Sequence, residues 1–301
     1  MKIALITPAS SSPYSGNTVT ARRYARILRG LGHRVILSDE HTGQDVDLLI
    51  ALHAKKSYAS ISRFRRTHRS TPIIVALTGT DLYRDIHTDP RAKESLQLAT
   101  RLVVLQGKAL DELPPDQRRK ATVVYQSVEP YSGGVHRLKT GFRVAVVANL
   151  REEKDPLRAA MAARLLPVTS RIRVVHIGGA LSRKLGRAAV QEMRVNPRYR
   201  WVGSTPHWKA RRLISGSHLL AITSRMEGSS NVLCEALASG TPVLASRIPG
   251  LAGTLGTRYP GYFPVGDTSA LAGLMCKAES DRRFYDHLKN SGAGFAQLVQ
   301  P

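Results

Sequence analysis

The chain has 301 residues, 42% of them hydrophobic, and its 45 lysines and arginines against 22 acidic residues give a net charge of +23. This length fits two α/β domains of roughly 130 to 160 residues each. No apolar run approaches the ~18 residues of a membrane span, and the first eight residues are too short and strand-like for a signal peptide, so we expect a cytoplasmic protein.

The elements in chain order predict two parallel sheets. Residues 2–7 are expected to form a buried strand, 16–31 a helix and 34–38 a second strand, which is a βαβ start. Further strands are expected at 47–52, 73–77, 102–105 and 122–125, and in a second series at 142–148, 173–177, 200–202, 219–223 and 243–245. We therefore predict an α/β protein with two doubly wound, Rossmann-like domains whose strand ends face a cleft, where such folds bind ligands.

The predicted domain boundary lies in a stretch rich in Pro, Gly and polar residues without a clear period. Residues 1–130 form the N-terminal domain, 131–141 the linker and 142–280 the C-terminal domain. Residues 281–301 are expected to form a C-terminal helix that could pack back on the N-terminal domain.

Two carboxylates eight residues apart mark the most informative stretch of the chain, residues 224–243. Glu227 lies in a loop after a strand, and Glu235 lies one turn inside a helix that opens at 229–231 with good N-cap residues. The unpaired N–H groups of this helix start would attract a phosphate, and the carboxylates would accept sugar hydroxyls. Two solvated glutamates near a helix start are the alternative.

Together with the small-residue pattern EALASGTPVLAS that follows, this E-x7-E motif resembles the signature of family 4-like retaining glycosyltransferases with the GT-B fold. The resemblance implies that Glu227 lies beside the donor sugar and that Glu235 holds the nucleotide ribose. The other donor-binding residues that it implies are Asn149, Gly178, Gly179, Val202, Gly203, Gly228, Ser229, Ser230, Asn231 and Val232.

Residues 147–156, VANLREEKDP, resemble the family segment whose basic pair binds the donor diphosphate. Lys154 matches the family Lys, whereas Asn149 stands at the position of the family Arg and Arg151 follows two residues later. Stabilising the leaving diphosphate should supply much of the rate. We therefore expect Lys154, Arg151 and Glu227 to be catalytic.

The N-terminal loops resemble the acceptor side of the family. Amides at the start of the helix at 16–31 could hold an anion, although an ordinary flexible turn is the alternative. The loop LTGTD at 77–81 aligns with a His-Gly-x-Asp loop whose His contacts the donor hexose; Thr78 replaces this His, and Asp81 either accepts a hydroxyl or caps a helix. The expected acceptor-side residues are Ser15, Gly16, Asn17, Thr18, His53, Thr78, Gly79, Thr80 and Asp81.

Metal and cofactor motifs are weak. Asp45 and Asp47 have the D-x-D form, but they precede their strand at its amino end, so we expect neither a metal nor a cofactor. Cys234 and Cys276 are far apart and indicate no disulfide or zinc site. No dinucleotide fingerprint, P-loop or nucleophile elbow supports a dehydrogenase, kinase or hydrolase.

The excess positive charge predicts an anionic partner. The basic residues are spread along the chain and no nucleic-acid module is present, which disfavours nucleic acid. The basic C-terminal half of the expected helix at 57–69 could dock on an anionic membrane or simply be a solvated face. Small phosphorylated substrates in a basic cleft need no further partner.

The loops at 8–18, 77–81 and 150–156 are most similar to a short subgroup of the family, the selenosugar synthases of selenoneine biosynthesis. This resemblance implies transfer of a sugar from UDP-GlcNAc or UDP-glucose to selenophosphate, with formation of a carbon–selenium bond. A trianionic, already nucleophilic acceptor would fit the positive charge, the short loops and the loss of the family His at Thr78. A UDP-sugar transferase acting on a lipid-linked or envelope acceptor, and a non-enzymatic nucleic-acid-binding protein, are the alternatives.

Overall fold

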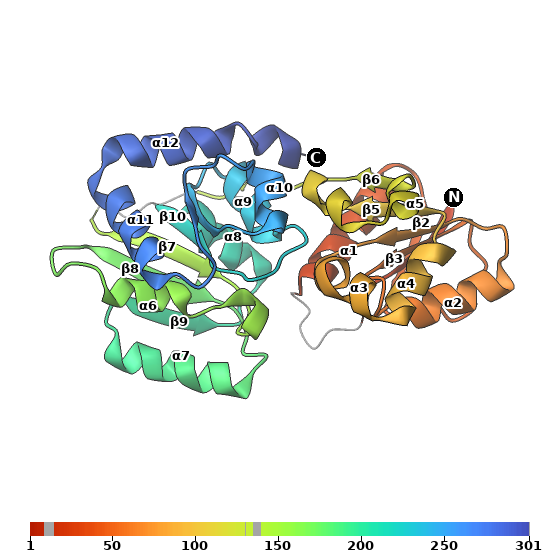
Figure 1. Ribbon diagram of the computed structural model, residues 1–301, viewed down its shortest axis with the longest axis horizontal. Helices are drawn as coiled ribbons and strands as arrows, with labels where there is room; N and C mark the ends of the chain where they lie inside the picture. The colour runs from red at the N-terminus through yellow and green to blue at the C-terminus, as the bar shows by residue number, and fades with distance from the viewer. Residues whose placement is uncertain (9–14, 130, 135–139, 301) are drawn as a thin grey trace. The chain divides into compact units, whose positions relative to one another are not determined.

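The computed structural model describes residues 1–8, 15–129, 131–134 and 140–300 (Figure 1). The chain divides into an N-terminal unit, Met1–Gln126 with Glu227–Asn231, and a C-terminal unit, Ser127–Met226 with Val232–Pro301. The predicted boundary with its linker at 131–141 stays a prediction, and residues 135–139 of that linker lie outside the described residues.

The N-terminal unit contains a six-stranded sheet in the order β2-β1-β3-β4-β5-β6, in which every neighbouring pair is parallel. Its strands are β1 (Lys2–Ile6), β2 (Arg34–Ser38), β3 (Leu48–Leu52), β4 (Ile73–Ala76), β5 (Arg101–Val104) and β6 (Ala121–Val123). Its helices are α1 (Gly16–Gly30), α2 (Tyr58–Thr67), the π-helix η1 (Asp81–Asp85), α3 (Ile86–Thr88), α4 (Pro90–Leu98), the 3-10 helix η2 (Gly107–Glu112) and α5 (Pro115–Arg118).

The central strands of this sheet are almost purely apolar because both of their faces are covered. In β1, every residue from Ile3 to Ile6 is buried, and in β3 the same holds from Leu49 to Leu52. Figure 1 shows helices packed around the sheet. Continuous apolar runs of four or five residues are typical of such doubly covered strands.

The C-terminal unit contains a second six-stranded parallel sheet in the order β12-β11-β10-β7-β8-β9. Its strands are β7 (Phe142–Val147), β8 (Ile172–Ile177), β9 (Tyr199–Gly203), β10 (Leu219–Ile222), β11 (Val243–Ser246) and β12 (Tyr262–Phe263). Its helices are the 3-10 helix η3 (Glu152–Lys154), α6 (Arg158–Arg164), α7 (Arg183–Val195), α8 (His207–Ser215), α9 (Asn231–Ala238), α10 (Pro249–Leu255), α11 (Thr268–Ser280), α12 (Arg282–Ala293) and the 3-10 helix η4 (Ala296–Val299). The predicted fold class is confirmed.

The C-terminal helix predicted at 281–301 forms as α12 and is anchored in the C-terminal unit. The hydroxyl of Tyr285 on α12 donates to the carbonyl of His218 at 3.1 Å, and the amide of Val128 donates to the carbonyl of Val299 at 2.7 Å. Packing of this helix on the N-terminal domain stays a prediction. No helix in the described part of the chain is long and apolar enough to cross a membrane.

Strand order fixes where each unit can bind a ligand. In the N-terminal unit the chain adds β2 on one side of β1 and β3 on the other, and in the C-terminal unit it adds β8 on one side of β7 and β10 on the other. Loops that leave two such neighbouring strands in opposite directions open a crevice at the carboxyl ends of the strands. The loops after β1 and β3, and those after β7 and β10, are therefore the first places to look for a site.

Candidate functional site

A side-chain amide joins the loops after β7 and β8. The Oδ1 atom of Asn149 accepts the backbone N–H of Gly179 at 2.9 Å, and Leu150 donates to the Gly179 carbonyl at 2.8 Å. Asn149 stands where the family resemblance predicts an Arg, and its side chain joins the loops at the ends of β7 and β8 by a hydrogen bond. Asn149 contributes no positive charge to a diphosphate, so any cation there must come from elsewhere.

Gly178 lies against the backbone of the neighbouring strand. A Cβ atom at this position would be 1.8 Å from the Ala148 carbonyl oxygen, so only glycine fits. The Gly178 amide donates to the Gly203 carbonyl at 2.9 Å, and its carbonyl accepts the indole N–H of Trp201 at 2.8 Å. The ends of β7, β8 and β9 thus form a continuous backbone wall, with Val202 exposed beside it.

A buried histidine lies beneath this wall. His176 in β8 has no exposed surface; its Nε2 lies 2.8 Å from the Ala148 carbonyl and its Nδ1 lies 2.8 Å from the Tyr199 hydroxyl. Nε2 must donate to the carbonyl, and Nδ1 can then accept from the hydroxyl, which satisfies the neutral ring. Burial lowers the pKa of His176 to about 4, and the bond to the Ala148 carbonyl opposes this shift only in part.

The segment that carries Arg151 and Lys154 is tied to the end of β10. Lys154 closes the turn η3 by donating its amide to the Arg151 carbonyl at 3.0 Å. The Thr223 hydroxyl, just after β10, lies 3.0 Å from the Lys154 carbonyl and 2.9 Å from the Asp155 carbonyl. The two predicted diphosphate cations therefore share one short turn at the switch point of the C-terminal sheet.

Two charged residues that directly follow this turn are paired with each other. Asp155, which has a positive φ of 42°, accepts from Arg158 at 3.0 Å and lies 3.8 Å from Arg225. Arg158 also donates to the Thr268 hydroxyl at 2.7 Å. Within the described residues, the exposed Arg151 side chain forms no ion pair, so its charge is available.

Glu235 is a buried carboxylate with a histidine partner. It lies in the second turn of α9, and its Oε1 atom is 2.6 Å from the Nε2 atom of His207 at the start of α8. Helix α9 begins at Asn231, within the predicted opening. Sequence reasoning missed His207, because a lone histidine 28 residues away carries no spacing signal.

The segment 227–231 belongs to the N-terminal unit, where its backbone lies close to the loop after β4. Glu227, Gly228, Ser229 and Ser230 are all buried, and a Cβ on Gly228 would be 2.3 Å from the Thr78 carbonyl. The Asn231 side chain accepts from Arg23 at 2.9 Å. The Ser229 hydroxyl is buried without a hydrogen-bond partner among the described residues.

On the acceptor side, Asp81 organises the loop after β4. One carboxylate oxygen accepts the amides of Thr78 and Gly79 at 2.9 and 2.8 Å, and the other accepts the amide of Ala54 at 3.0 Å. Asp81 is the first residue of η1, whose N-cap is Thr80, and its carboxylate bonds backwards along the chain. The alternative that it caps the following helix is therefore wrong.

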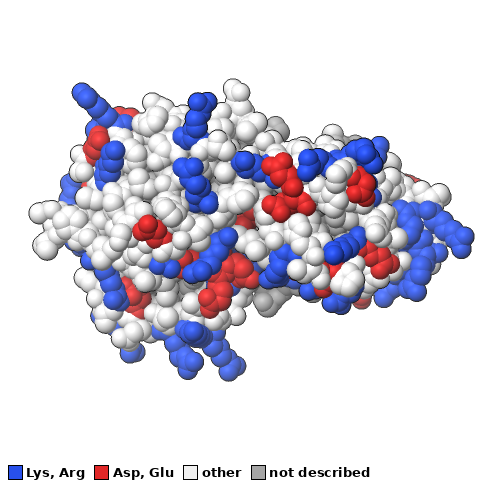
Figure 2. Space-filling view, viewed as in Figure 1, with Lys and Arg blue, Asp and Glu red and all other residues white. Residues whose placement is uncertain are grey.

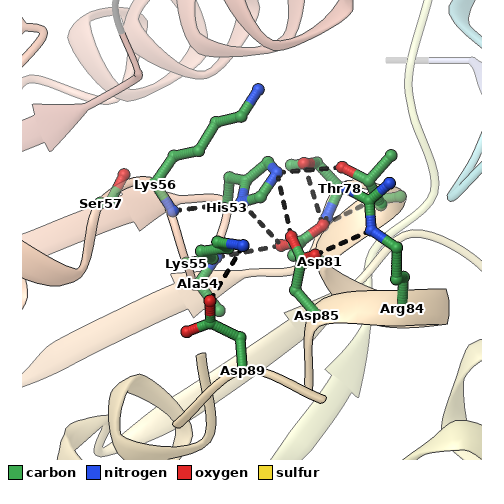
Figure 3. Close-up of polar contacts among 12 residues, drawn as sticks. His53, Ala54, Lys55, Lys56, Ser57, Thr78, Asp81, Arg84, Asp85 and Asp89 are labelled. Atoms are coloured by element: carbon green, nitrogen blue, oxygen red, sulfur yellow. Dashed lines mark hydrogen bonds and ion pairs between the residues drawn. The ribbon is translucent and has the colours of Figure 1, made fainter. Parts of the chain in front are cut away.

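His53 points into the same loop from the end of β3 (Figure 3). Its backbone has a positive φ of 74°, its Nδ1 accepts the Lys56 amide at 3.4 Å, and its Nε2 lies 3.1 Å from the Thr80 hydroxyl. Asp81 and Asp85 approach the two ring nitrogens at 4.0 Å each. Burial nevertheless dominates and lowers the pKa of His53, so the ring is neutral near pH 7.

The loop predicted to hold an anion before α1 is partly self-capped. The Ser15 hydroxyl accepts the Thr18 amide at 3.2 Å and lies 2.8 Å from the Thr18 hydroxyl. The Thr18 hydroxyl is therefore engaged within the cap, while Gly16 and Asn17 form the first residues of α1. Residues 9–14 of this loop lie outside the described residues.

The D-x-D pair lies where the sequence places it. Asp45 and Asp47 precede β3, and an Asp47 carboxylate oxygen accepts the Lys2 amide at 2.7 Å. The absence of a metal requirement stays a prediction.

Solved structures with the same architecture are glycosyltransferases. HepE of Anabaena, in complex with UDP and glucose, is 15% identical with a TM-score of 0.77, covering 100% of this chain and 96% of that chain. Sucrose-phosphate synthase of Thermosynechococcus elongatus is 16% identical with a TM-score of 0.76, covering 99% and 94%. The pneumococcal O-GlcNAc transferase GtfA, in complex with UDP and GlcNAc, is 14% identical with a TM-score of 0.63, covering 84% and 55%. At these identities the likeness shows the fold, which is GT-B.

No curated protein matches the sequence significantly. A family model, described as glycosyl transferases group 1, matches residues 134–294. Because this match extends over more than half of the chain, the protein belongs to the group 1 glycosyl transferases.

Proposed function

We propose that this protein transfers a hexose or N-acetylhexosamine from a UDP-sugar to selenophosphate and releases UDP. The observation that carries the donor half is Glu235, a carboxylate with only 3% of its side chain exposed, held by His207 at the start of a helix in the matched region. The HepE and GtfA structures contain UDP, which supports the choice of nucleotide.

The C-terminal unit would assist the reaction mainly by stabilising the leaving group. When the bond between the anomeric carbon and the diphosphate breaks, its electron pair leaves with UDP, and the diphosphate oxygen gains negative charge. Lys154 and Arg151 on the turn η3 would stabilise this charge. Since Asn149 supplies no charge and Arg158 is paired with Asp155, we assign the second diphosphate contact to Arg151.

Selenophosphate is favoured as acceptor by charge and by chemistry. A net charge of +23 favours a small, highly charged anion. The selenium atom would attack the anomeric carbon, the carbon–oxygen bond to UDP would break, and the product would be a sugar with selenium linked to phosphate. Attack of water on the phosphorus–selenium bond would then give the free selenosugar and phosphate. Because selenophosphate is already an anionic nucleophile, it requires little help from a base such as the His that Thr78 replaces.

The test is a mass-spectrometric assay with UDP-GlcNAc, with and without enzymatically generated selenophosphate, on the native protein and on Glu235→Ala. Selenium-dependent UDP release with a seleno-hexosamine product, lost in the variant, is the expected result. UDP-sugar binding without any effect of selenophosphate would reject this acceptor and keep the donor half.

A lipid-linked or envelope acceptor is the second candidate, and the surface of α2 favours it. Figure 2 shows Lys and Arg gathered at the right-hand end of the view, where Figure 1 places α2. Arg65 donates to the carbonyls of Arg69 and Thr71, whereas the guanidinium groups of the exposed Arg66 and Arg69 form no hydrogen bond or ion pair with the described residues. Flotation with vesicles containing phosphatidylglycerol distinguishes the two candidates: salt-sensitive binding that Arg66→Glu abolishes supports the membrane acceptor, and no binding rejects it.

A further inference from the structure

A short hydrogen bond links two helices of the C-terminal unit. His207 is the first residue of α8, and Glu235 lies in α9; the distance from Nε2 of His207 to Oε1 of Glu235 is 2.6 Å. The imidazole side chain is 42% exposed, whereas the carboxylate side chain is 3% exposed. The solvent side of this pair is thus formed by the histidine and the buried side by the glutamate.

The chemistry of the pair fixes the proton. An ionised carboxylate can only accept hydrogen bonds, so Nε2 of His207 must carry the hydrogen and donate it. Bonds to an ionised acceptor are shorter and stronger than neutral ones, in agreement with the observed distance. His207 therefore fixes both the position of Oε1 and the rotation of the carboxylate about its last bond.

The second oxygen of Glu235 is left without a protein donor. Within the described residues, His207 is the one group that donates to this carboxylate, and Oε2 accepts no hydrogen bond. An ionised carboxylate oxygen can accept more than one hydrogen bond, so Oε2 has its full acceptor capacity left for a ligand. A hydroxyl group of a ligand would supply the missing donor.

We infer that His207 is a positioning residue that turns the Oε2 atom of Glu235 toward the ribose hydroxyls of the bound nucleoside diphosphate. This inference rests on the proposed function and on the family resemblance, which implies that Glu235 holds the nucleotide ribose. It assigns to His207 a part of the selectivity for ribose over deoxyribose. No pattern in the sequence assigns this role to position 207.

A ligand-dependent effect separates this role from a structural one. If His207 only tied α8 to α9, its loss would weaken every nucleotide equally through a less stable unit. If it orients Glu235, its loss weakens only ligands that present ribose hydroxyls. Uridine diphosphate and 2′,3′-dideoxyuridine diphosphate differ in those hydroxyls alone, so their affinities provide the comparison.

The experiment is isothermal titration of both nucleotides into the full-length protein and its variants. His207→Leu removes the donor, His207→Asn keeps polarity but shortens the side chain, and His207→Gln keeps a donor that can still reach the carboxylate. Lys209→Ala is the matched control, because Lys209 is exposed on the same helix and its contact is with the Trp208 ring. Circular dichroism establishes that each variant is folded.

We expect His207→Leu to weaken UDP binding about tenfold, the size of one lost bond to a charged group, and to change dideoxy-UDP binding less than twofold. His207→Gln should recover most of the loss, and Lys209→Ala should resemble the native protein. In a Glu235→Ala background, His207→Leu should have no further effect, because the two residues act through one contact. If His207→Leu does not fold, His207→Asn takes its place with the same expectation.

Several outcomes would overturn the inference. Equal weakening of both nucleotides, or no weakening of either, would show that His207 does not act through the ribose. A native protein that binds both nucleotides equally well would reject the ribose contact of Glu235, and His207 with it. A native protein that binds neither nucleotide would instead reject the proposed function itself.

Discussion

Acidification should destabilise the C-terminal unit through His176 well before carboxylates titrate. The neutral ring is fully hydrogen-bonded between the Ala148 carbonyl and the Tyr199 hydroxyl, and it has no exposed surface. A proton added to Nδ1 would force the Tyr199 hydroxyl to turn from donor to acceptor and would place a charge in the core. The folded unit therefore resists protonation, whereas the unfolded chain does not.

The size of the effect follows from the two pKa values. The folded pKa is lowered to about 4, against 6.5 for an unperturbed histidine. Between these values the unfolded state binds one more proton than the folded state, so stability rises with pH by about 1.4 kcal/mol per unit. This contribution is fully present above pH 6.5, and about 3 kcal/mol is lost as the pH falls to 4.

Denaturant unfolding followed by tryptophan fluorescence measures this loss of stability in the C-terminal unit. The two tryptophans of the chain, Trp201 and Trp208, both lie in the C-terminal unit, whereas His41 and His53, whose pKa values are also lowered, lie in the other. His176→Gln should be less stable than the native protein at pH 7. Between pH 4.5 and 6, however, its free energy of unfolding should depend less steeply on pH, by the amount that corresponds to about one proton. Equal slopes in both proteins, or an NMR titration of His176 near pH 6.5, would refute the reasoning.

Four further predictions follow from the candidate sites. Lys154→Ala should lower turnover at least about a hundredfold while the unfolding midpoint stays within a few degrees, measured by UDP release and calorimetry, because its side chain would act on the leaving group; unchanged turnover would remove it from the mechanism. Gly178→Ala should destabilise the protein by more than about 2 kcal/mol in denaturant titration, because its Cβ would be 1.8 Å from the Ala148 carbonyl. Gly179→Ala, where the nearest contact of the added Cβ is at 3.6 Å, should destabilise it by less than half of that amount. Asp81→Asn should lower the protection of the Ala54 amide in hydrogen exchange and leave that of Thr78 and Gly79 nearly unchanged, because the one oxygen of Asn can still accept the last two amides while its NH2 group replaces the oxygen that accepts Ala54. Finally, turnover should be unchanged in chelator, and its loss would overturn the expectation of a metal-independent reaction.

Much of the fold follows from short-range patterns. Continuous apolar runs predicted the strands β1 to β11 to within two residues at either end, because central strands of a parallel sheet are buried on both faces. The two-residue strand β12 was not predicted, since Tyr262 and Phe263 are too short a run to carry a period. The start of helix α9 was predicted within the E-x7-E motif, because the N-cap and first turn of a helix depend on a few neighbouring residues.

The candidate sites were predicted only in part, because their contacts join residues that are far apart in the sequence. Asp81 was placed correctly on the loop after β4, but its three amide donors come from a loop and from Ala54, which lies 27 residues earlier. The partnership of His207 with Glu235 spans 28 residues and two helices, and that of His176 with Tyr199 spans 23. Contacts of this kind depend on the packing of finished elements, for which a single sequence contains no local signal.

Two of the three histidines of the candidate sites favour an acceptor that brings its own reactivity. His53 and His176 are kept neutral by burial and spend their ring nitrogens on protein groups, and the donating nitrogen of His207 is bound to Glu235. The rings of His53 and His176 therefore present no free nitrogen to remove a proton from an alcohol, whereas Nδ1 of the partly exposed His207 accepts no hydrogen bond within the described residues. A neutral hydroxyl acceptor would need such a base, whereas an anionic selenium or phosphate nucleophile would not. The engaged ring nitrogens of His53 and of His176, each within its own unit, and the excess of positive charge therefore favour the same class of acceptor, for reasons that are physically independent.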